Sequence, residues 1–159
     1  MLIAVISDTH DNIFRLQKAV VEINNRNINI VFHCGDIGLE TIKILKKEKF
    51  IVYAVCGNSD DYNVLKDVVE NSNIKLFEDA GECTIDNINI AITHYPDFAR
   101  LLASSKKYNI IFYGHTHKRK VEEIYNTQLI NPGDIEGRNR YPSFLIYNTA
   151  NKGFEFINI

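Results

Sequence analysis

Residues 2–23 read LIAVISDTHDNIFRLQKAVVEI, in which an apolar run stops at a polar cluster and a second apolar pattern begins. The first run, Leu2–Ile6, is short and partly β-branched, as is typical of a strand covered on both faces. Apolar residues then recur at helical spacing, at Ile13, Leu16, Val20 and Ile23. Asp11 or Asn12 is available as the N-cap of this helix. The stretch therefore predicts the first strand and helix of a β-α-β unit.

The same alternation of strand and helix continues downstream. Short apolar runs predict strands at 30–32 and 51–55, and apolar residues at helical spacing predict helices around 39–45 and 64–69. A β-α-β-α-β order implies parallel strands joined by right-handed crossovers. The first half of the chain is thus expected to form a largely parallel sheet.

The second half changes character, because turn signals divide it into hairpins. These signals stand at 86–87, 126–127 and 151–153. A helix is expected after Pro96, which suits a first helical turn, and a strand is expected at 110–113. We therefore predict an α/β fold of two mixed sheets packed together, with helices on the outside.

Composition indicates one soluble domain over residues 1–159. Hydrophobic residues make up 45% of the chain and charged residues 24%, and the net charge of −2 argues against a protein that mainly grips long nucleic acid. The apolar start of the chain ends at Asp8, too early for a signal or membrane-spanning segment. Three widely spaced cysteines, Cys34, Cys56 and Cys83, are typical of reduced thiols. We expect a cytoplasmic protein with no membrane partner.

Five hydrophobic runs end at clusters of polar residues. The clusters lie at 7–10, 33–36, 56–60, 93–94 and 114–117. The carboxyl ends of strands in an open α/β sheet form the edge at which ligands bind. Side chains that are far apart in the sequence are therefore expected to meet in one cleft.

These clusters carry the mixture of nitrogen and oxygen donors that a pair of divalent cations requires. Asp8 and His10 can reach one cation, His115 and His117 can each serve a different one, and Asp36 is the candidate bridge. Two divalent cations, two carboxylates and a bridging hydroxide leave a charge of about +1, which suits a phosphodiester monoanion.

The ordered motifs DTH (8–10), GD (35–36), GN (57–58), His94 and GHTH (114–117) resemble the signature of the calcineurin-like metallophosphoesterases. The short chain and its Asn-Pro-Gly stretch after the last motif look like the small phosphodiesterase branch of bacteria and archaea. The resemblance covers nearly the whole chain. It implies a four-layer α/β/β/α sandwich.

The resemblance also implies a site and an activity. The first cation would be bound by Asp8, His10 and His117, the second by Asn58, His94 and His115, and both by Asp36. A hydroxide between the cations would attack phosphorus in line, with Asp36, Asn58 and His94 catalytic through it. The resemblance favours Mn²⁺, whereas the donor set also suits Ni²⁺, Fe, Co²⁺ or Zn²⁺.

The sequence departs from this family at three positions. Ser59 stands where many relatives carry a histidine that protonates the leaving group, and a serine is a poor acid. Asp60 is expected to cap a helix, with a role as an acid as the alternative. Tyr95 replaces a glycine and could contact the substrate or pack on the rim. Asp134 replaces a small serine and could cap a turn or discourage dianionic substrates.

Several further residues are open to more than one interpretation. Asn12 could bind the substrate phosphate as well as cap the first helix. His33 is expected to support the site or to pack, and Cys34 and Cys56 to lie in the core. The basic run of residues 118–120, KRK, could steer phosphate-bearing substrates or be a solvated edge.

The predicted function is hydrolysis of a small phosphoester, with a phosphodiester favoured as the substrate. The alternatives are a phosphomonoesterase, a nuclease, and a non-catalytic scaffold like the retromer subunit of this fold, which lacks part of the ligand set. Retention of all seven ligand positions favours catalysis. The exposed edges of the predicted hairpins are compatible with a homo-oligomer.

Overall fold

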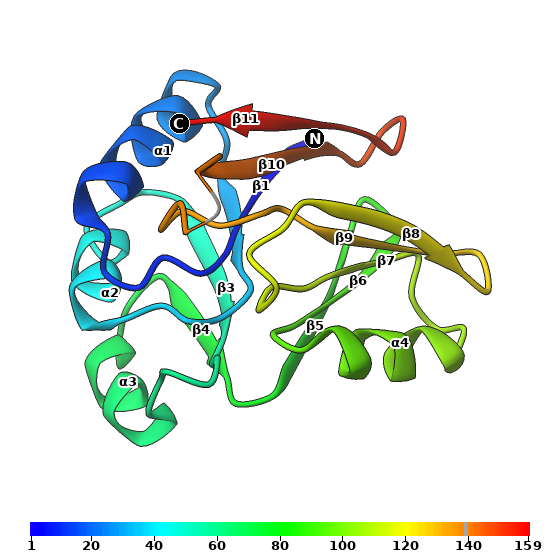
Figure 1. Ribbon diagram of the computed structural model, residues 1–159, viewed down its shortest axis with the longest axis horizontal. Coiled ribbons are helices and arrows are strands. Elements are labelled where there is room, and N and C mark those ends of the chain that lie inside the picture. Colours follow the sequence, from blue (N-terminus) through cyan, green and yellow to red (C-terminus); the bar gives the residue numbers. More distant parts are fainter. Residues whose placement is uncertain (139) are drawn as a thin grey trace.

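The computed structural model describes residues 1–138 and 140–159, and Figure 1 shows their arrangement. Strands and helices follow in the order β1 (Leu2–Ile6), α1 (Ile13–Asn25), β2 (Ile30–His33), α2 (Leu39–Leu45), β3 (Ile51–Val55), α3 (Tyr62–Val69), β4 (Ile74–Phe77), β5 (Ala80–Ile85), β6 (Ile88–Thr93), α4 (Pro96–Ser104), β7 (Ile110–Phe112), β8 (Lys120–Ile124), β9 (Thr127–Asn131), β10 (Ser143–Asn148) and β11 (Gly153–Asn158). The β-α-β-α-β order expected from the sequence is confirmed.

The strands form two mixed sheets. The first has the order β11-β10-β1-β2-β3-β4, in which β1 to β4 are parallel and the β10–β11 hairpin adds antiparallel strands beside β1. The second has the order β5-β6-β7-β9-β8, with β6, β7 and β9 parallel and antiparallel strands at both edges. The parallel strands of each sheet therefore end at the same edge, and the loops that follow them lie where ligands bind in open α/β sheets.

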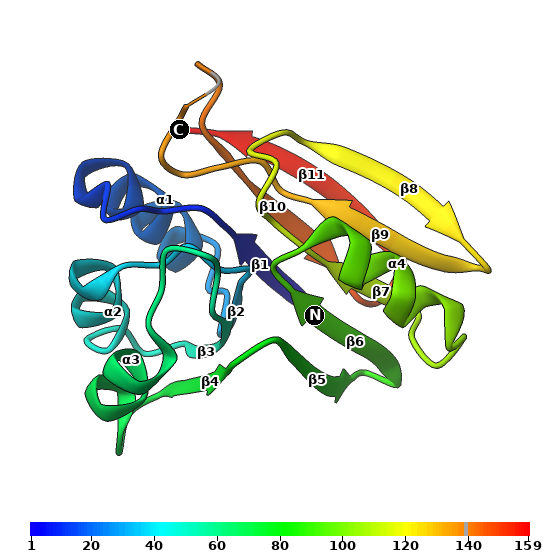
Figure 2. The ribbon, with the colours of Figure 1, turned by 60° about the horizontal axis from the view of Figure 1, so that its bottom comes forward.

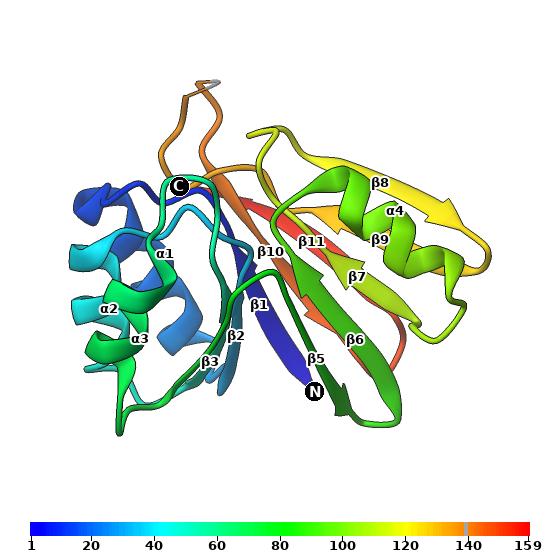
Figure 3. The ribbon, with the colours of Figure 1, turned by 90° about the horizontal axis from the view of Figure 1, so that it is seen from below.

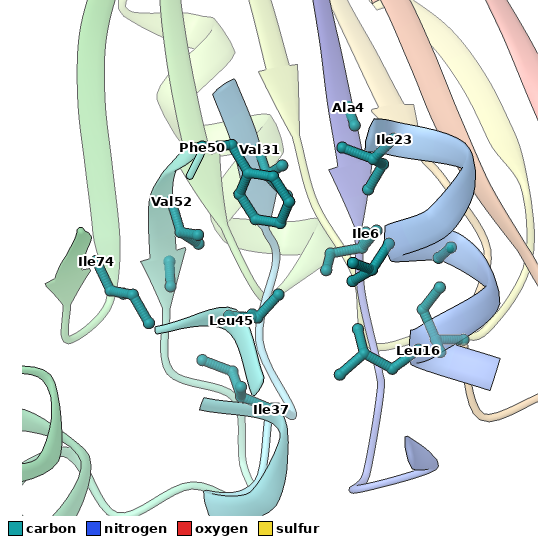
Figure 4. Close-up of a cluster of buried hydrophobic side chains, with 14 of the residues drawn as sticks. Ala4, Ile6, Leu16, Ile23, Val31, Ile37, Leu45, Phe50, Val52 and Ile74 are labelled. Atoms are coloured by element: carbon teal, nitrogen blue, oxygen red, sulfur yellow. The ribbon is translucent and has the colours of Figure 1, made fainter. Parts of the chain in front are cut away.

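The first sheet has a hydrophobic core on each face, one shared with α1 to α3 and the other with the second sheet. Alternate residues of β1 face opposite sides: Ala4 and Ile6 pack under α1 to α3, whereas Ile3 and Val5 pack against the second sheet. Figure 4 shows the core between the helices and the first sheet, with Phe50 at its centre. Burial on both faces explains why the β1 sequence is a continuous apolar run rather than an alternating one.

The second sheet repeats this arrangement with α4. Ile110 and Phe112 of β7 face the first sheet. Ile111 faces the other way and packs against Ala99 and Ala103 of α4. Figures 2 and 3 show α1 to α3 on one side, the two sheets in the middle and α4 on the other side. The predicted four-layer α/β/β/α sandwich is confirmed.

The structure differs from the sequence prediction in detail. The short edge strand β4 was not predicted, because its four residues lack the length of a clear apolar run. The β8–β9 turn lies at Tyr125 and Asn126, one residue earlier than expected, and both have left-handed φ angles of 52° and 66°. The three cysteines are free, as predicted. Among the described residues, no helix combines the length and apolarity that a bilayer crossing needs.

Candidate metal centre

The loops that follow five strands bring all seven predicted ligands together. Asp8 and His10 follow β1, Asp36 follows β2, Asn58 follows β3, His94 follows β6, and His115 and His117 follow β7. Side-chain contacts join His117 to Asp8 and link the other five to one another, and stacking of the His10 and His117 rings brings these two sets together. We call Asp8, His10, Asp36 and His117 the first donor group, and Asn58, His94 and His115 the second.

The backbone at these positions is unusual. Five of the seven residues have left-handed φ angles, which non-glycine residues rarely adopt: Asp8 50°, His10 44°, Asp36 53°, His115 70° and His117 56°. Such conformations persist only where the surroundings enforce them, and they gather at functional sites. Here the surroundings are the two neighbouring loops, joined by backbone hydrogen bonds such as those from Thr9 N and His10 N to Asp36 O. These backbone conformations bring the five side chains close together.

The first donor group is compact enough to bind one cation. Its four candidate ligand atoms all lie within 4.8 Å of one another. His10 Nε2 lies 3.3 Å from Asp36 Oδ2, and His117 Nε2 lies 3.4 Å from Asp8 Oδ1. The two imidazole rings stack with centroids 5.4 Å apart and an interplanar angle of 9°. His10 Nε2 is buried without a hydrogen-bond partner, as expected for a nitrogen that binds a cation.

Asp8 is fully buried, and two neighbours fix its carboxylate. Ser7 Oγ donates to Asp8 Oδ2 at 2.5 Å, and the backbone N–H of His115 donates to both oxygens at 3.1 and 3.2 Å. Burial nevertheless raises the pKa of Asp8 to about 7. A Cβ at Gly114 would collide with Ser7 Oγ and Asp8 Oδ2, so only glycine lets this loop approach so closely. A bound cation would offset the cost of burying this charge.

The second donor group brings three polar side-chain atoms close together. Asn58 Oδ1 lies 3.0 Å from His115 Nδ1 and 3.2 Å from His94 Nε2, and these two nitrogens are 3.2 Å apart. His94 Nδ1 lies 2.7 Å from the carbonyl of Cys34, which can only accept, so Nδ1 carries the proton. Burial lowers the pKa of His94, so its Nε2 presents a lone pair. A cation between these atoms would take lone pairs from Asn58 Oδ1 and His94 Nε2, and from His115 Nδ1 in the tautomer that carries its proton on Nε2.

Asp36 of the first donor group also lies next to the second. Its Oδ2 is 3.3 Å from His10 Nε2 and 3.6 Å from His94 Nε2. Its Oδ1 accepts hydrogen bonds from Ser59 N at 2.9 Å and from Ser59 Oγ at 2.8 Å. Burial alone would raise the pKa of Asp36, but the Ser59 hydrogen bonds and His94 lower it overall. The orienting role of Ser59 was not predicted from the sequence.

The interpretation of Asp60 was wrong. Asp61 caps α3, whereas Asp60 accepts hydrogen bonds from the backbone N–H groups of Gly57, Ile37 and Gly38. It therefore joins the loops after β2 and β3, which carry Asp36 and Asn58. A carboxylate committed to three backbone donors is an anchor, and nothing in its contacts supports a role as an acid.

The two predicted substrate-binding residues have other contacts. Asn12 caps α1 by accepting from Arg15 N at 3.3 Å, and it donates to Glu136 O at 3.2 Å. Tyr95 is 39% exposed, and its ring lies edge-on to His94 and His115 with centroids 5.0 and 5.2 Å apart. Tyr95 thus stands on the rim of the second donor group. Contact of either residue with substrate stays a prediction.

His33 and the first two cysteines lie behind the site. His33 Nε2 is 2.7 Å from Thr9 Oγ1, and full burial lowers the pKa of this histidine to about 3. It therefore supports the loop after β1 as a neutral side chain. Cys34 lies in the core between the sheets and Cys56 in the core under the helices, as predicted.

The segment after β9 adds two carboxylates beside the first donor group. Ile135 N donates to Ser7 O and Glu136 N to Asp8 O, each at 3.0 Å, so this segment lies directly on the end of β1. Asp134 Oδ2 is 3.0 Å from His117 Nδ1. Glu136 Oε2 is 3.8 Å from both His10 Nε2 and His117 Nδ1. Asp134 could be singled out from the sequence, whereas Glu136 could not, because its only signal is its place two residues further on.

A surface cavity of about 280 Å³ borders the first donor group. Its walls are His117, Lys118, Arg119, Gly133 and Tyr141. Lys120, by contrast, pairs with Glu122 at 2.7 Å on the edge strand β8. The basic run therefore divides: Lys118 and Arg119 stand beside the centre, and Lys120 belongs to the solvated edge.

Comparisons with known proteins identify the family of this chain. The sequence model of the calcineurin-like phosphoesterase superfamily domain matches residues 1–152. Phosphodiesterase MJ0936 of Methanocaldococcus jannaschii is 32% identical over 166 aligned positions, which cover 99% of this chain and 98% of that protein. A solved structure of an archaeal phosphodiesterase has a TM-score of 0.88 at 32% identity, covering 100% of both chains. Vps29 of Entamoeba histolytica complexed with Zn²⁺ shares the fold, with a TM-score of 0.68 at 19% identity over 100% of this chain and 98% of that one. The chain belongs to the calcineurin-like phosphoesterase superfamily.

Proposed function

We propose that this protein is a metal-dependent phosphodiesterase with a dinuclear centre. The observation that carries the proposal is the position of Asp36, whose Oδ2 lies within 3.6 Å of donor nitrogens from both groups. The name of the relative from Methanocaldococcus jannaschii supports the reaction class. When bound, such a cation pair supplies an activated water for in-line attack on phosphorus and polarises the phosphoryl oxygens.

The side chains of this protein prepare the centre for that reaction. Asp36 is held between the groups by Ser59, so one carboxylate oxygen is oriented before any ligand arrives. Asn58 and His94 present neutral ligand atoms, 3.2 Å apart, next to Asp36. We propose that Asp36, Asn58 and His94 are the catalytic residues. They would act by binding and orienting the cations and not as nucleophiles.

A diester is favoured over a monoester by charge and by space. Asp134 and Glu136 add negative charge beside the first donor group, which repels a dianionic monoester more strongly than a monoanionic diester. The cavity lined by Lys118 and Tyr141 leaves room for a second ester arm next to His117. We therefore propose a small phosphodiester as substrate and, given the net charge of −2, not long nucleic acid.

We also propose Mn²⁺ as the activating ion. All seven donors are imidazole nitrogens or carboxylate and amide oxygens, which suit Mn²⁺ and also Ni²⁺, Fe, Co²⁺ or Zn²⁺. No thiolate is among them, and the three free cysteines fit a reducing, cytoplasmic compartment.

The test is metal-dependent turnover. The protein is stripped with a chelator, single divalent ions are added back, and hydrolysis of bis-nitrophenyl phosphate is compared with that of nitrophenyl phosphate. We expect turnover with Mn²⁺, a preference for the diester, and loss of both activities in Asp36→Ala. Glu123→Gln on the exposed face of β8 is the matched control that removes a remote carboxylate. A wild-type protein that is as inert as Asp36→Ala with every ion would refute the proposal.

The alternative function is a scaffold. It is favoured by the shared fold with Vps29, a structure of which contains Zn²⁺. Metal binding alone therefore does not separate the two functions, whereas turnover does. Cation binding without hydrolysis of either ester would favour the scaffold.

A further inference from the structure

A buried carboxylate stands behind the first donor group. Asp134 is 1% exposed, and its Oδ2 accepts a hydrogen bond from the backbone N–H of Arg138 at 2.8 Å and lies 3.0 Å from His117 Nδ1. Its other oxygen, Oδ1, is buried without a hydrogen-bond partner. Among the described residues, no lysine or arginine forms an ion pair with Asp134. Such a carboxylate is costly to bury unless something positive lies nearby.

The contact with Asp134 determines which nitrogen of His117 faces the first donor group. A carboxylate only accepts, so His117 Nδ1 is the donor in this contact. His117 Nε2 is then the ring nitrogen with a lone pair, and it lies 3.4 Å from Asp8 Oδ1, a second acceptor. A carboxylate that donates its charge through an imidazole to a cation is a common support for metal-binding histidines. A cation at Nε2 would also make the Nδ1–H group a stronger hydrogen-bond donor. The stronger bond to Asp134 would offset the cost of burying this carboxylate.

We propose that Asp134 is a positioning residue that acts through His117 to tighten cation binding at the first donor group. This inference needs the cation binding of the proposed function but not its turnover. In the part of the chain that the structure describes, Asp134 forms no hydrogen bond or ion pair with Asn58, His94 or His115, so we expect the second donor group to gain nothing from it. The first position consequently fills before the second.

Glu136 contributes less than Asp134. Its Oε2 lies 3.8 Å from His10 Nε2 and His117 Nδ1, which is beyond hydrogen-bond length, and 3.4 Å from Arg138 Nε. The same oxygen pairs with Arg138, so part of its charge is offset before it reaches the two histidines. We therefore place the effect in the fixed contact of Asp134 rather than in the general acidity of the segment.

The experiment is a calorimetric titration of the metal-free protein with Mn²⁺. Asp134→Asn keeps the shape of the side chain and offers His117 a neutral hydrogen-bond acceptor. The serine side chain of Asp134→Ser is too short to contact the His117 ring. Glu123→Gln, which neutralises a remote exposed carboxylate, is the matched control. We expect the dissociation constant of the tighter position to rise by about 10- to 100-fold in Asp134→Ser, and by less in Asp134→Asn. The weaker position should change no more than in the control.

Two further measurements separate positioning from general damage. The visible spectrum of the Co²⁺-loaded protein reports ligand geometry, and we expect it to differ from wild type in Asp134→Ser. Thermal unfolding of the metal-free variants tests whether they fold. If Asp134→Ser does not fold, Asp134→Asn carries the test.

Three outcomes overturn the inference: equal weakening of both positions, an affinity no lower than that of the control, or a wild-type protein that binds no Mn²⁺. The last of these also removes the metal-dependent function. A wild-type protein that binds Mn²⁺ in two classes but hydrolyses neither ester refutes the function and leaves the role of Asp134 standing.

Discussion

The two donor groups differ in how firmly the protein holds them. In the first, Asp8, Asp36 and His117 are buried, and each has an outer partner: Ser7, Ser59 and Asp134 respectively. In the second, His94 is buried, whereas Asn58 and His115 are exposed. The first group is therefore organised before a cation arrives, and the second stands open to solvent and substrate. For the proposed dinuclear centre we therefore expect one tightly held cation and one that exchanges more readily.

The largest expected effect comes from removing one ligand from each group. Asp8→Asn places an amide N–H₂ where Ser7 and His115 N–H donate, and it removes a buried charge of the first group. We expect turnover of bis-nitrophenyl phosphate to fall by on the order of 10³-fold, with loss of the tighter Mn²⁺ position. Asn58→Ala should lose activity while retaining that position, as measured by bound Mn²⁺ per chain. Loss of both cations in Asn58→Ala would contradict the difference between the groups.

The second prediction concerns metal-linked stability. A cation that binds only the folded chain stabilises it by about 2.7 kcal/mol at a hundredfold excess over Kd, or roughly 5–10 °C in Tm for a chain of this size. We expect this rise on adding Mn²⁺ to the metal-free protein. His117→Ala should abolish most of the rise and His115→Ala should keep most of it, as followed by thermal melting. Equal losses in the two variants would mean that the groups bind with similar strength.

The convergence of the seven candidate ligands could be predicted from the sequence because each follows a buried apolar run. His94 comes directly after β6, and Asp8 comes two residues after the end of β1. Strand ends of parallel sheets meet at one edge, so spacing in the sequence does not matter for their convergence. The layers were predictable for a similar reason, since both faces of β1 are apolar.

The outer partners could not be predicted, because they depend on how loops pack on each other. Ser59 reaches Asp36 across a separation of 23 residues, and Asp134 reaches His117 only because the segment after β9 lies on the end of β1. No local pattern encodes such contacts. Asp60 was misassigned for the same reason, since an acid before a helix is typical of an N-cap and Asp61 satisfied that role first.

A smaller effect is expected at Ser59, which supports the residue shared by both groups. Ser59→Ala removes the Oγ hydrogen bond to Asp36 and keeps the backbone N–H bond. A hydrogen bond to a charged group contributes about 1.5–3 kcal/mol, so we expect kcat/KM to fall by about 10- to 100-fold. Ser59→Thr keeps the hydroxyl and should retain most of the activity. If the threonine variant is as slow as the alanine variant, the hydroxyl does not orient Asp36.

The smallest effect is expected at Tyr95, on the exposed rim of the second group. Its ring contacts His94 and His115 edge-on, and Tyr95→Phe preserves those contacts. We therefore expect kcat/KM for bis-nitrophenyl phosphate to change by less than about threefold in Tyr95→Phe. Tyr95→Leu should lose more, because aromatic pairs of this kind contribute about 0.5–1.5 kcal/mol. A tenfold loss in Tyr95→Phe, seen in KM rather than in Mn²⁺ affinity, would instead show that the hydroxyl touches the substrate, and the open side of the centre would then be a binding surface as well as a metal site.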